Sequence, residues 1–267
     1  ERMLDHARRA DNQRLLRRGA LGLAVNALYG PTPVTTAIAQ CEASLTAEMN
    51  DRQVEGMVTS KLALLKAMNG EFEVARALYR KGRAMLDELG ESMRAASTPV
   101  DLVMIERLTG DLASAERAVM PDYEFFARTG ETYYLSTVAA HLARVIRDQG
   151  RDDEALALLA AAEGAAAEDD IDAQILWRSI RAPIVARSGD TATAQQLAQS
   201  AAEMAAQTED PVLQADSLCE LATVLQLAGD SAAARTAAER AATIYRAKGD
   251  RVSAARTGDW IKRLGVA

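Results

Sequence analysis

The chain has 267 residues, a formal net charge of -7 and a pI near 5.1. This acidic balance argues against a general nucleic-acid-binding protein, because neutralising phosphates normally needs a clustered excess of Lys and Arg. Alanine is abundant, aromatic residues make up only 4% of the chain, and clusters of β-branched residues are absent, so the composition predicts helices throughout.

Membrane and secretion signals are not found in the sequence. There is no apolar run of about 18 residues and no charged-then-apolar leader, so we expect a soluble, cytoplasmic protein without a membrane partner. The two cysteines, Cys41 and Cys219, stand about five repeats apart, too far to bridge, and fit a reducing compartment. A start at Glu1 suggests a piece of a longer polypeptide.

Glycines mark a repeat along the chain. They recur at intervals of 40, 40, 40, 39 and 40 residues, and a period in this range is typical of stacked helical units. The repeat predicts one continuous domain over residues 1–267, in which each unit contacts only its neighbours. The six turn glycines are Gly30, Gly70, Gly110, Gly150, Gly189 and Gly229.

Each unit is predicted to hold two antiparallel helices, an A helix ending at the turn glycine and a B helix following it. Apolar residues before each glycine recur at spacings of three and four, as expected for one buried helical face. Acidic residues just after the glycines suit helix starts. In chain order, the predicted helices lie near 2–28, 33–49, 52–68, 72–89, 92–108, 112–129, 132–148, 152–168, 171–187, 191–208, 211–228, 231–248 and 252–264.

Two features depart from the regular unit. Pro99, Pro121 and Pro183 fall inside predicted helices and should kink them or break their first turns. The last helix, with Trp260 and Ile261 on one side, has no B partner and should cap the stack. The predicted fold class is an all-α, right-handed superhelical solenoid of about six helix pairs plus a C-terminal capping helix.

The run GEFEVARALYRKGRAML around Gly70 resembles the second half of a tetratricopeptide repeat. It has the turn glycine, an alanine at the fifth position (Ala75) and a large residue at the ninth (Tyr79), and GRDDEALALLAAAE at Gly150 is similar. The period exceeds the 34 residues of that family, whose tryptophan is missing here. HEAT and armadillo units remain the structural alternative.

A narrower resemblance covers nearly the whole chain. The strings RGALGLAVNALYGPTPV, YLSTVAAHLARVIRDQGRDDEAL and DAQILWRSIRAPIVARSGD are similar to C-terminal repeat regions of bacterial multidomain signalling proteins. Those proteins carry a class III nucleotide cyclase domain and an AAA-like or STAND-type ATPase domain ahead of the repeats. The resemblance implies a regulatory segment and transfers no catalytic activity to this chain.

Candidate binding residues come from the tetratricopeptide resemblance, which places A-helix positions on a concave face. Its N-terminal end is apolar and methionine-rich, whereas its centre carries four arginines that suit a carboxylate or phosphate. The alternative is that these arginines pair internally with acids such as Asp148 and Glu106. The predicted concave-face residues are Ser60, Leu64, Met68, Met104, Arg107, Arg144, Arg147 and Arg187.

Catalytic and metal-binding motifs are not found in the sequence. No phosphate loop, zinc-protease motif, nucleophile elbow or paired-cysteine motif occurs, and His6 and His141 stand on different repeats, so we expect neither an enzyme nor a cofactor. Trp177 and Trp260 are expected in the core or cap, and the acidic cluster at 168–173 at a solvated helix end.

The first functional hypothesis is therefore a non-catalytic interaction or regulatory module. Its concave face would bind a peptide, an acidic one included, a protein partner or a neighbouring domain of its parent protein. The alternative is a sensor of a small anionic ligand that regulates attached cyclase or ATPase domains. Self-association through the terminal repeats is a further expectation.

Overall fold

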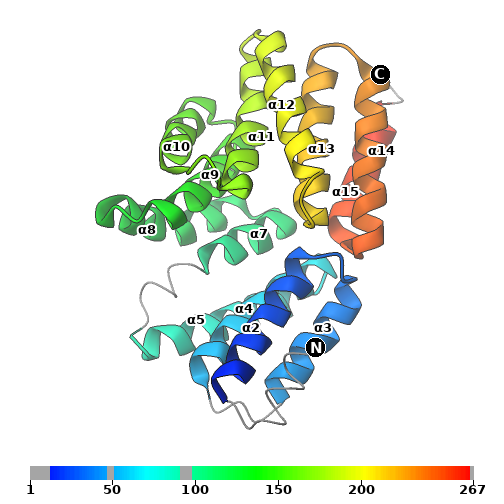
Figure 1. Ribbon diagram of the computed structural model, residues 1–267. Coiled ribbons are helices and arrows are strands. Elements are labelled where there is room, and N and C mark those ends of the chain that lie inside the picture. The colour runs from blue at the N-terminus through cyan, green and yellow to red at the C-terminus, as the bar shows by residue number, and fades with distance from the viewer. Residues whose placement is uncertain (1–12, 47–50, 91–97, 265–267) are drawn as a thin grey trace.

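The computed structural model describes residues 13–46, 51–90 and 98–264, and everything regular in these ranges is helical. Figure 1 shows the helices following one another in antiparallel pairs along a curved path. In chain order they are α2 (Gln13–Tyr29), α3 (Val34–Thr46), α4 (Arg52–Met68), α5 (Phe72–Glu88), α7 (Pro99–Thr109), α8 (Leu112–Thr129), α9 (Thr132–Asp148), α10 (Asp152–Ala165), α11 (Ile171–Arg187), α12 (Thr191–Ala205), α13 (Pro211–Leu227), α14 (Ser231–Lys248) and α15 (Arg251–Leu264).

The pairing agrees with the predicted repeat. Six hairpins, from α2–α3 to α13–α14, are followed by α15, so the described residues form an all-α helical-repeat solenoid with a capping helix. The predicted boundaries agree with the described helices to within three residues, apart from the starts near 2 and 92 and the end near 49. These fall in residues 1–12, which include His6, residues 91–97 and residues 47–50, which lie outside the described ranges.

The turn glycines explain why the hairpins recur. The five later ones have φ between 82° and 101°, a left-handed conformation that residues with a Cβ rarely adopt. Asp111, Asp190 and Asp230 follow three of them and accept a hydrogen bond from a backbone amide of the next helix. Gly30 differs, because its turn is made without a positive φ.

One of the three prolines begins a helix, and the other two lie inside continuous helices. Pro99 is the first residue of α7, where its missing amide costs nothing. By contrast, α8 and α11 run without a break through Pro121 and Pro183. Broken first turns are therefore wrong for these two helices.

Small residues bring neighbouring helices close together. A Cβ added to Gly82 of α5 would lie only 2.6 Å from the carbonyl oxygen of Gly56 in α4. Alanines such as Ala63 and Ala143 are fully buried between units. The stack therefore depends on close backbone approach as well as on large apolar side chains.

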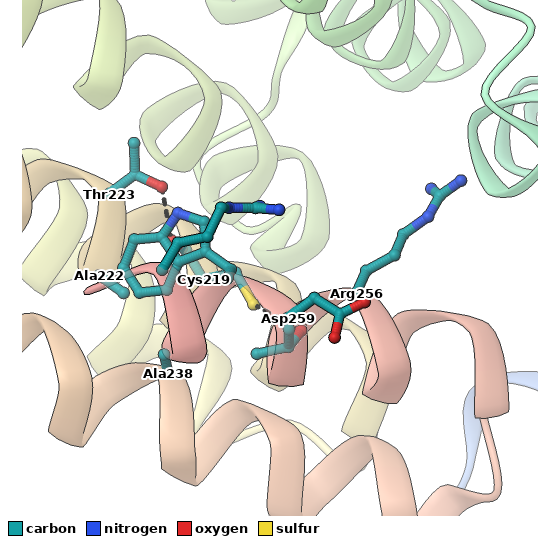
Figure 2. A pocket seen from close by; sticks show the side chains of 9 residues that line it. Cys219, Ala222, Thr223, Ala238, Arg256 and Asp259 are labelled. Carbon is teal, nitrogen blue, oxygen red and sulfur yellow. Dashed lines mark hydrogen bonds between the residues drawn. The ribbon is translucent and has the colours of Figure 1, made fainter. Parts of the chain in front are cut away.

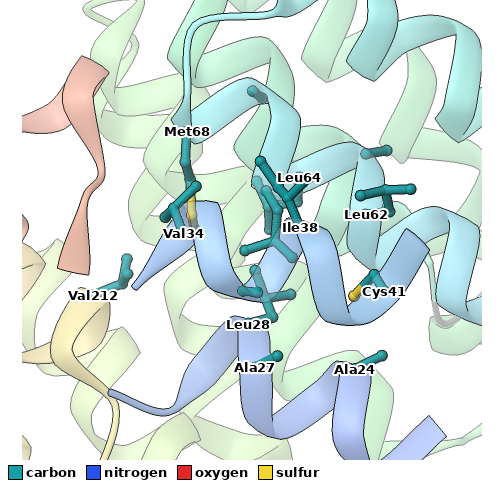
Figure 3. Packing of buried hydrophobic residues seen from close by; sticks show 14 of the residues in the cluster. Ala24, Ala27, Leu28, Val34, Ile38, Cys41, Leu62, Leu64, Met68 and Val212 are labelled. Atoms are coloured by element: carbon teal, nitrogen blue, oxygen red, sulfur yellow. The ribbon is translucent and has the colours of Figure 1, made fainter. Parts of the chain in front are cut away.

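The first and last units also contact each other, which corrects the prediction that only neighbours touch. Lys248, at the end of α14, is 1% exposed and donates hydrogen bonds to the carbonyl oxygens of Ala27, Gly30 and Thr32 at 2.7–2.8 Å. Val212 of α13 packs into the same core as Leu28 and Val34 (Figure 3). The rotation between successive units accumulates until the sixth unit meets the first.

The capping helix joins this closure. Trp260 and Ile261 pack against Ala222, Ala237 and Ala238, as expected of a cap. Arg256 of α15 donates to the carbonyl oxygens of Arg107 and Leu108, at 2.7 and 2.8 Å, beyond the end of its own stack. We call these Lys248 and Arg256 contacts the closure contacts.

Candidate binding surface on the inner wall

Three of the predicted concave-face residues in α4 are buried: Ser60, Leu64 and Met68, which is 2% exposed. Leu64 is fully buried, and the buried hydroxyl of Ser60 donates to Asp101 at 2.8 Å. Asp101 also accepts from Lys61 at 2.9 Å. Ser60 and Leu64 therefore have no exposed surface to offer a ligand.

Met68, Met104 and Arg107 do lie together. They line a cavity of about 160 Å³ in the middle of the molecule, which we call the central cavity. Side chains from the second, third and sixth units and from the cap meet around it, because the superhelix closes. Its other lining residues are Leu108, Val212, Asp216, Cys219, Glu220, Tyr245, Asp250, Ser253, Arg256 and Thr257.

Arg144 and Arg147 of α9 form a buried ionic network with α13. Arg144 is 1% exposed and donates through Nη1 to Oδ2 of Asp216. Arg147 binds Glu220 with two parallel hydrogen bonds, Nη1 to Oε2 at 2.8 Å and Nη2 to Oε1 at 2.9 Å. These are charge-assisted pairs between A helices two units apart.

The remaining donors of Arg147 are also used. Its Nε and Nη2 bind Asp148 at 3.0 and 2.8 Å, and Nη1 reaches the carbonyl oxygen of Ile180 on α11 at 3.3 Å. The side chain therefore passes over α11 on its way to α13. A ligand carboxylate would have to displace existing partners to reach this guanidinium.

Asp216 is the centre of the network. Tyr245 of α14 donates its hydroxyl to Oδ1 of this carboxylate. Burial opposes its ionisation, but Arg144 and Arg107 together hold the pKa of Asp216 below its usual value. The same burial, with Arg144 and Arg107 nearby, lowers the pKa of His141 to about 3, so this histidine is neutral.

Arg107 and Arg187 are more exposed than Arg144 and Arg147. Arg107 lies 3.8 Å from Asp148 and 3.8 Å from Asp216, longer than a hydrogen bond, and its side chain is 25% exposed. Arg187 binds Asp152 at 2.6 Å on the surface, where its side chain is 39% exposed. Of the four predicted arginines, Arg107 is the one that lines the central cavity.

The acidic partners of these arginines differ in part from those predicted. Asp148 does bind Arg147, but Glu106 pairs with Arg76 of α5 at 2.6 Å. Asp216 and Glu220 were missed. They are the two acidic residues of α13, four positions apart in an otherwise uncharged helix, and that isolation is the signal that could have found them.

The thiols fit packing roles. Cys41 is buried and Cys219 is half-buried, and both are free. Burial, with Asp216 nearby, raises the pKa of the Cys219 thiol to about 12, so it is not a ready nucleophile. Within the described ranges, no three His, Cys, Asp or Glu side chains converge as a metal site.

No family model matches the sequence, and the search of curated proteins found no match. Among solved structures, the chain is similar to the crystal structure of BtubC (BKLC) from P. vanneervenii, with a TM-score of 0.55 and 17% identity. The match covers 80% of this chain and 89% of BtubC, which is also helical. At this identity the likeness shows the fold alone.

No helix within the described residues is long and apolar enough to cross a membrane.

Proposed function

We propose that this chain is a non-catalytic, tetratricopeptide-like interaction module that binds a protein, a peptide or a neighbouring domain. The binding surface would be its inner wall, the concave face that includes Met68, Met104 and Arg107 of the central cavity. The observation that carries the proposal is the central cavity, where residues of three units and the cap converge. Stacked hairpins provide such a wall without any reaction centre.

The cavity suggests what a partner would insert. About 160 Å³ is smaller than a typical small-molecule pocket but accommodates one long side chain. Met68 and Met104 offer an adaptable apolar surface to its stem, and Arg107 offers a loosely held guanidinium to an acidic head. An acidic peptide is therefore the preferred partner.

The setting of the module is part of the proposal. The sequence resemblance alone supports an attached cyclase or STAND-type ATPase domain as the neighbouring domain. The free thiols of Cys41 and Cys219 support a cytoplasmic protein. Self-association through the end units stays a prediction.

Site-specific photo-crosslinking in the cells that make the protein tests the inner-wall proposal. A benzophenone amino acid at position Met104 should yield a defined crosslinked product. The same group at position Glu203, which is exposed on α12, is the matched outer control. Products from position Glu203 alone, or from neither position, would contradict the proposal.

The second candidate function is a sensor of a small anionic ligand. Arg107 and Arg256 favour it, because both line the central cavity and neither has a carboxylate within hydrogen-bonding distance among the described residues. A ligand bound there would touch a closure contact directly and could alter the curvature of the solenoid.

A further inference from the structure

A second cavity lies between the last hairpin and the cap. It measures about 380 Å³, within the range of small-molecule sites, and is bounded by α13, α14 and α15 (Figure 2). We call it the cap cavity. It shares Cys219, Arg256 and Thr257 with the central cavity, so the two are adjacent.

The cap cavity has an apolar floor made of small residues. Ala222 and Ala238 line it, and both are about 1% exposed. Trp260 from the cap adds an indole that is partly buried. The cap cavity is open because its floor is made of alanines, and larger side chains at these positions would fill it. The apolar body of a ligand fits against these alanines and the indole.

The rim of the cap cavity carries two guanidinium groups. Arg263 is exposed and makes no ion pair within the part of the chain that the structure describes. Arg256 donates to two backbone carbonyl oxygens and has no carboxylate partner in that part. Asp259 is the acidic residue of the lining; Lys262 binds it at 2.8 Å, and Lys262 and the nearby Arg263 lower its pKa.

The polar groups deeper in the cavity are neutral. The Cys219 sulfur lies 3.7 Å from the Thr257 hydroxyl, and Thr223 donates to the carbonyl oxygen of Cys219 at 3.0 Å. The thiol keeps its proton, and the buried carboxylates nearest to it, Asp216 and Glu220, are paired with Arg144 and Arg147. An apolar, neutral interior with a cationic rim is complementary to an amphipathic acid.

We propose that the cap cavity binds a small organic acid, with its apolar body against Trp260 and Ala238 and its carboxylate at Arg263. The inference rests on the second candidate function, ligand sensing, and moves the binding site from the central arginines to the cap. It is independent of the proposed protein partner on the inner wall.

The chain offers its own probe for the test. It contains two tryptophans, and Trp177→Phe leaves Trp260 as the sole fluorescent indole. In this background, titration with 3-phenylpropionate should change the fluorescence saturably below about 10 mM. The neutral amide of the same compound should bind at least about fivefold more weakly than the acid. The acid should also bind the Arg263→Met variant at least about fivefold more weakly than the parent protein.

Two further variants locate the ligand. Thr223→Leu extends a side chain into the cavity without removing a contact to another helix, and should weaken binding by about tenfold or more. Thr236→Leu makes the same change on the exposed side of α14, and Arg246→Met removes an exposed arginine outside the lining. Both controls should bind like the parent. Thermal melting followed by circular dichroism verifies the folding of each variant.

Three results would overturn the inference. They are no saturable signal, equal affinity for the acid and its amide, or an affinity unaffected by both Thr223→Leu and Arg263→Met. Loss of binding in Arg107→Met with full binding in Thr223→Leu would place the acid in the central cavity. That result would remove the cap site and leave the second candidate function standing.

Discussion

The contacts between neighbouring helices and those that close the superhelix use different chemistry. Neighbouring helices such as α4 and α5 meet through small apolar residues and direct backbone approach. The inner wall and the closure contacts use long cations that reach over one or more helices to carboxylates or to carbonyl oxygens. A repeated pattern is enough for the first kind, whereas the second needs individual residues at single positions.

Within the second kind, the acceptors also differ. Arg144 and Arg147 meet carboxylates, so burying the cation also buries an anion. Lys248 and Arg256 meet the carbonyl oxygens near the ends of α2 and α7, where helices leave acceptors unsatisfied. Removing a cation therefore leaves an unpaired charge in one case and unpaired dipoles in the other.

Arg144→Met should have the largest effect on stability. The substitution leaves Asp216 buried with only the Tyr245 hydroxyl in hydrogen-bonding contact. We therefore expect the free energy of unfolding, measured by urea denaturation, to fall by about 3–5 kcal/mol. Arg187→Met removes an exposed pair and should cost less than about 1 kcal/mol. Similar losses for both variants would show that the network is not a buried one.

Lys248→Met should lower the free energy of unfolding by about 3 kcal/mol, because two buried carbonyl oxygens and one partly buried one lose their donor. Hydrogen exchange should accelerate in α2 and α3 more than in α9 to α12, since the closure contact holds the first unit. The exposed Lys262→Met is the control. Uniform acceleration along the chain would contradict a separate closure.

His141 should make the protein less stable in mild acid. Its folded pKa is about 3 against 6.5 in the unfolded chain, so below pH 6.5 the unfolded state takes up a proton that the folded state does not. The free energy of unfolding should fall by about 2 kcal/mol from this group at pH 5.

The comparison with His141→Gln isolates this effect. Burial raises the pKa values of Asp210 and Asp250 to about 6, so these two groups act in the opposite direction over the same range. The difference in stability between wild type and variant should therefore change between pH 7 and pH 5. A constant difference would mean that His141 has the same pKa in the folded and unfolded states.

Gly82→Ala should give the smallest decrease in the free energy of unfolding, about 1–2 kcal/mol. The new Cβ would lie 2.6 Å from the Gly56 carbonyl oxygen, and the strain outweighs the gain in helix propensity. Gly258→Ala in α15 meets nothing within 4 Å and should stabilise by up to about 1 kcal/mol. Stabilisation by both would show that α4 and α5 can move apart.

The binding surface was only partly predictable. Met68, Met104 and Arg107, which the resemblance placed among the A-helix positions of the concave face, do line one cavity. The resemblance could not show that Ser60 and Leu64 are covered, or that Arg144 and Arg147 meet Asp216 and Glu220 across α11. Those contacts depend on the curvature of the stack.

The sequence by itself determined the hairpins. Glycines such as Gly110 require a left-handed turn, and apolar residues at helical spacing require a buried face, so both are local properties that a single chain displays. Only the tertiary structure decided that the sixth unit meets the first and that Lys248 binds backbone carbonyl oxygens some 220 residues away in sequence. It also decided that the central cavity and the cap cavity both include Arg256, one of the closure-contact residues. Closure results from small rotations summed over six units, a quantity that no local pattern records.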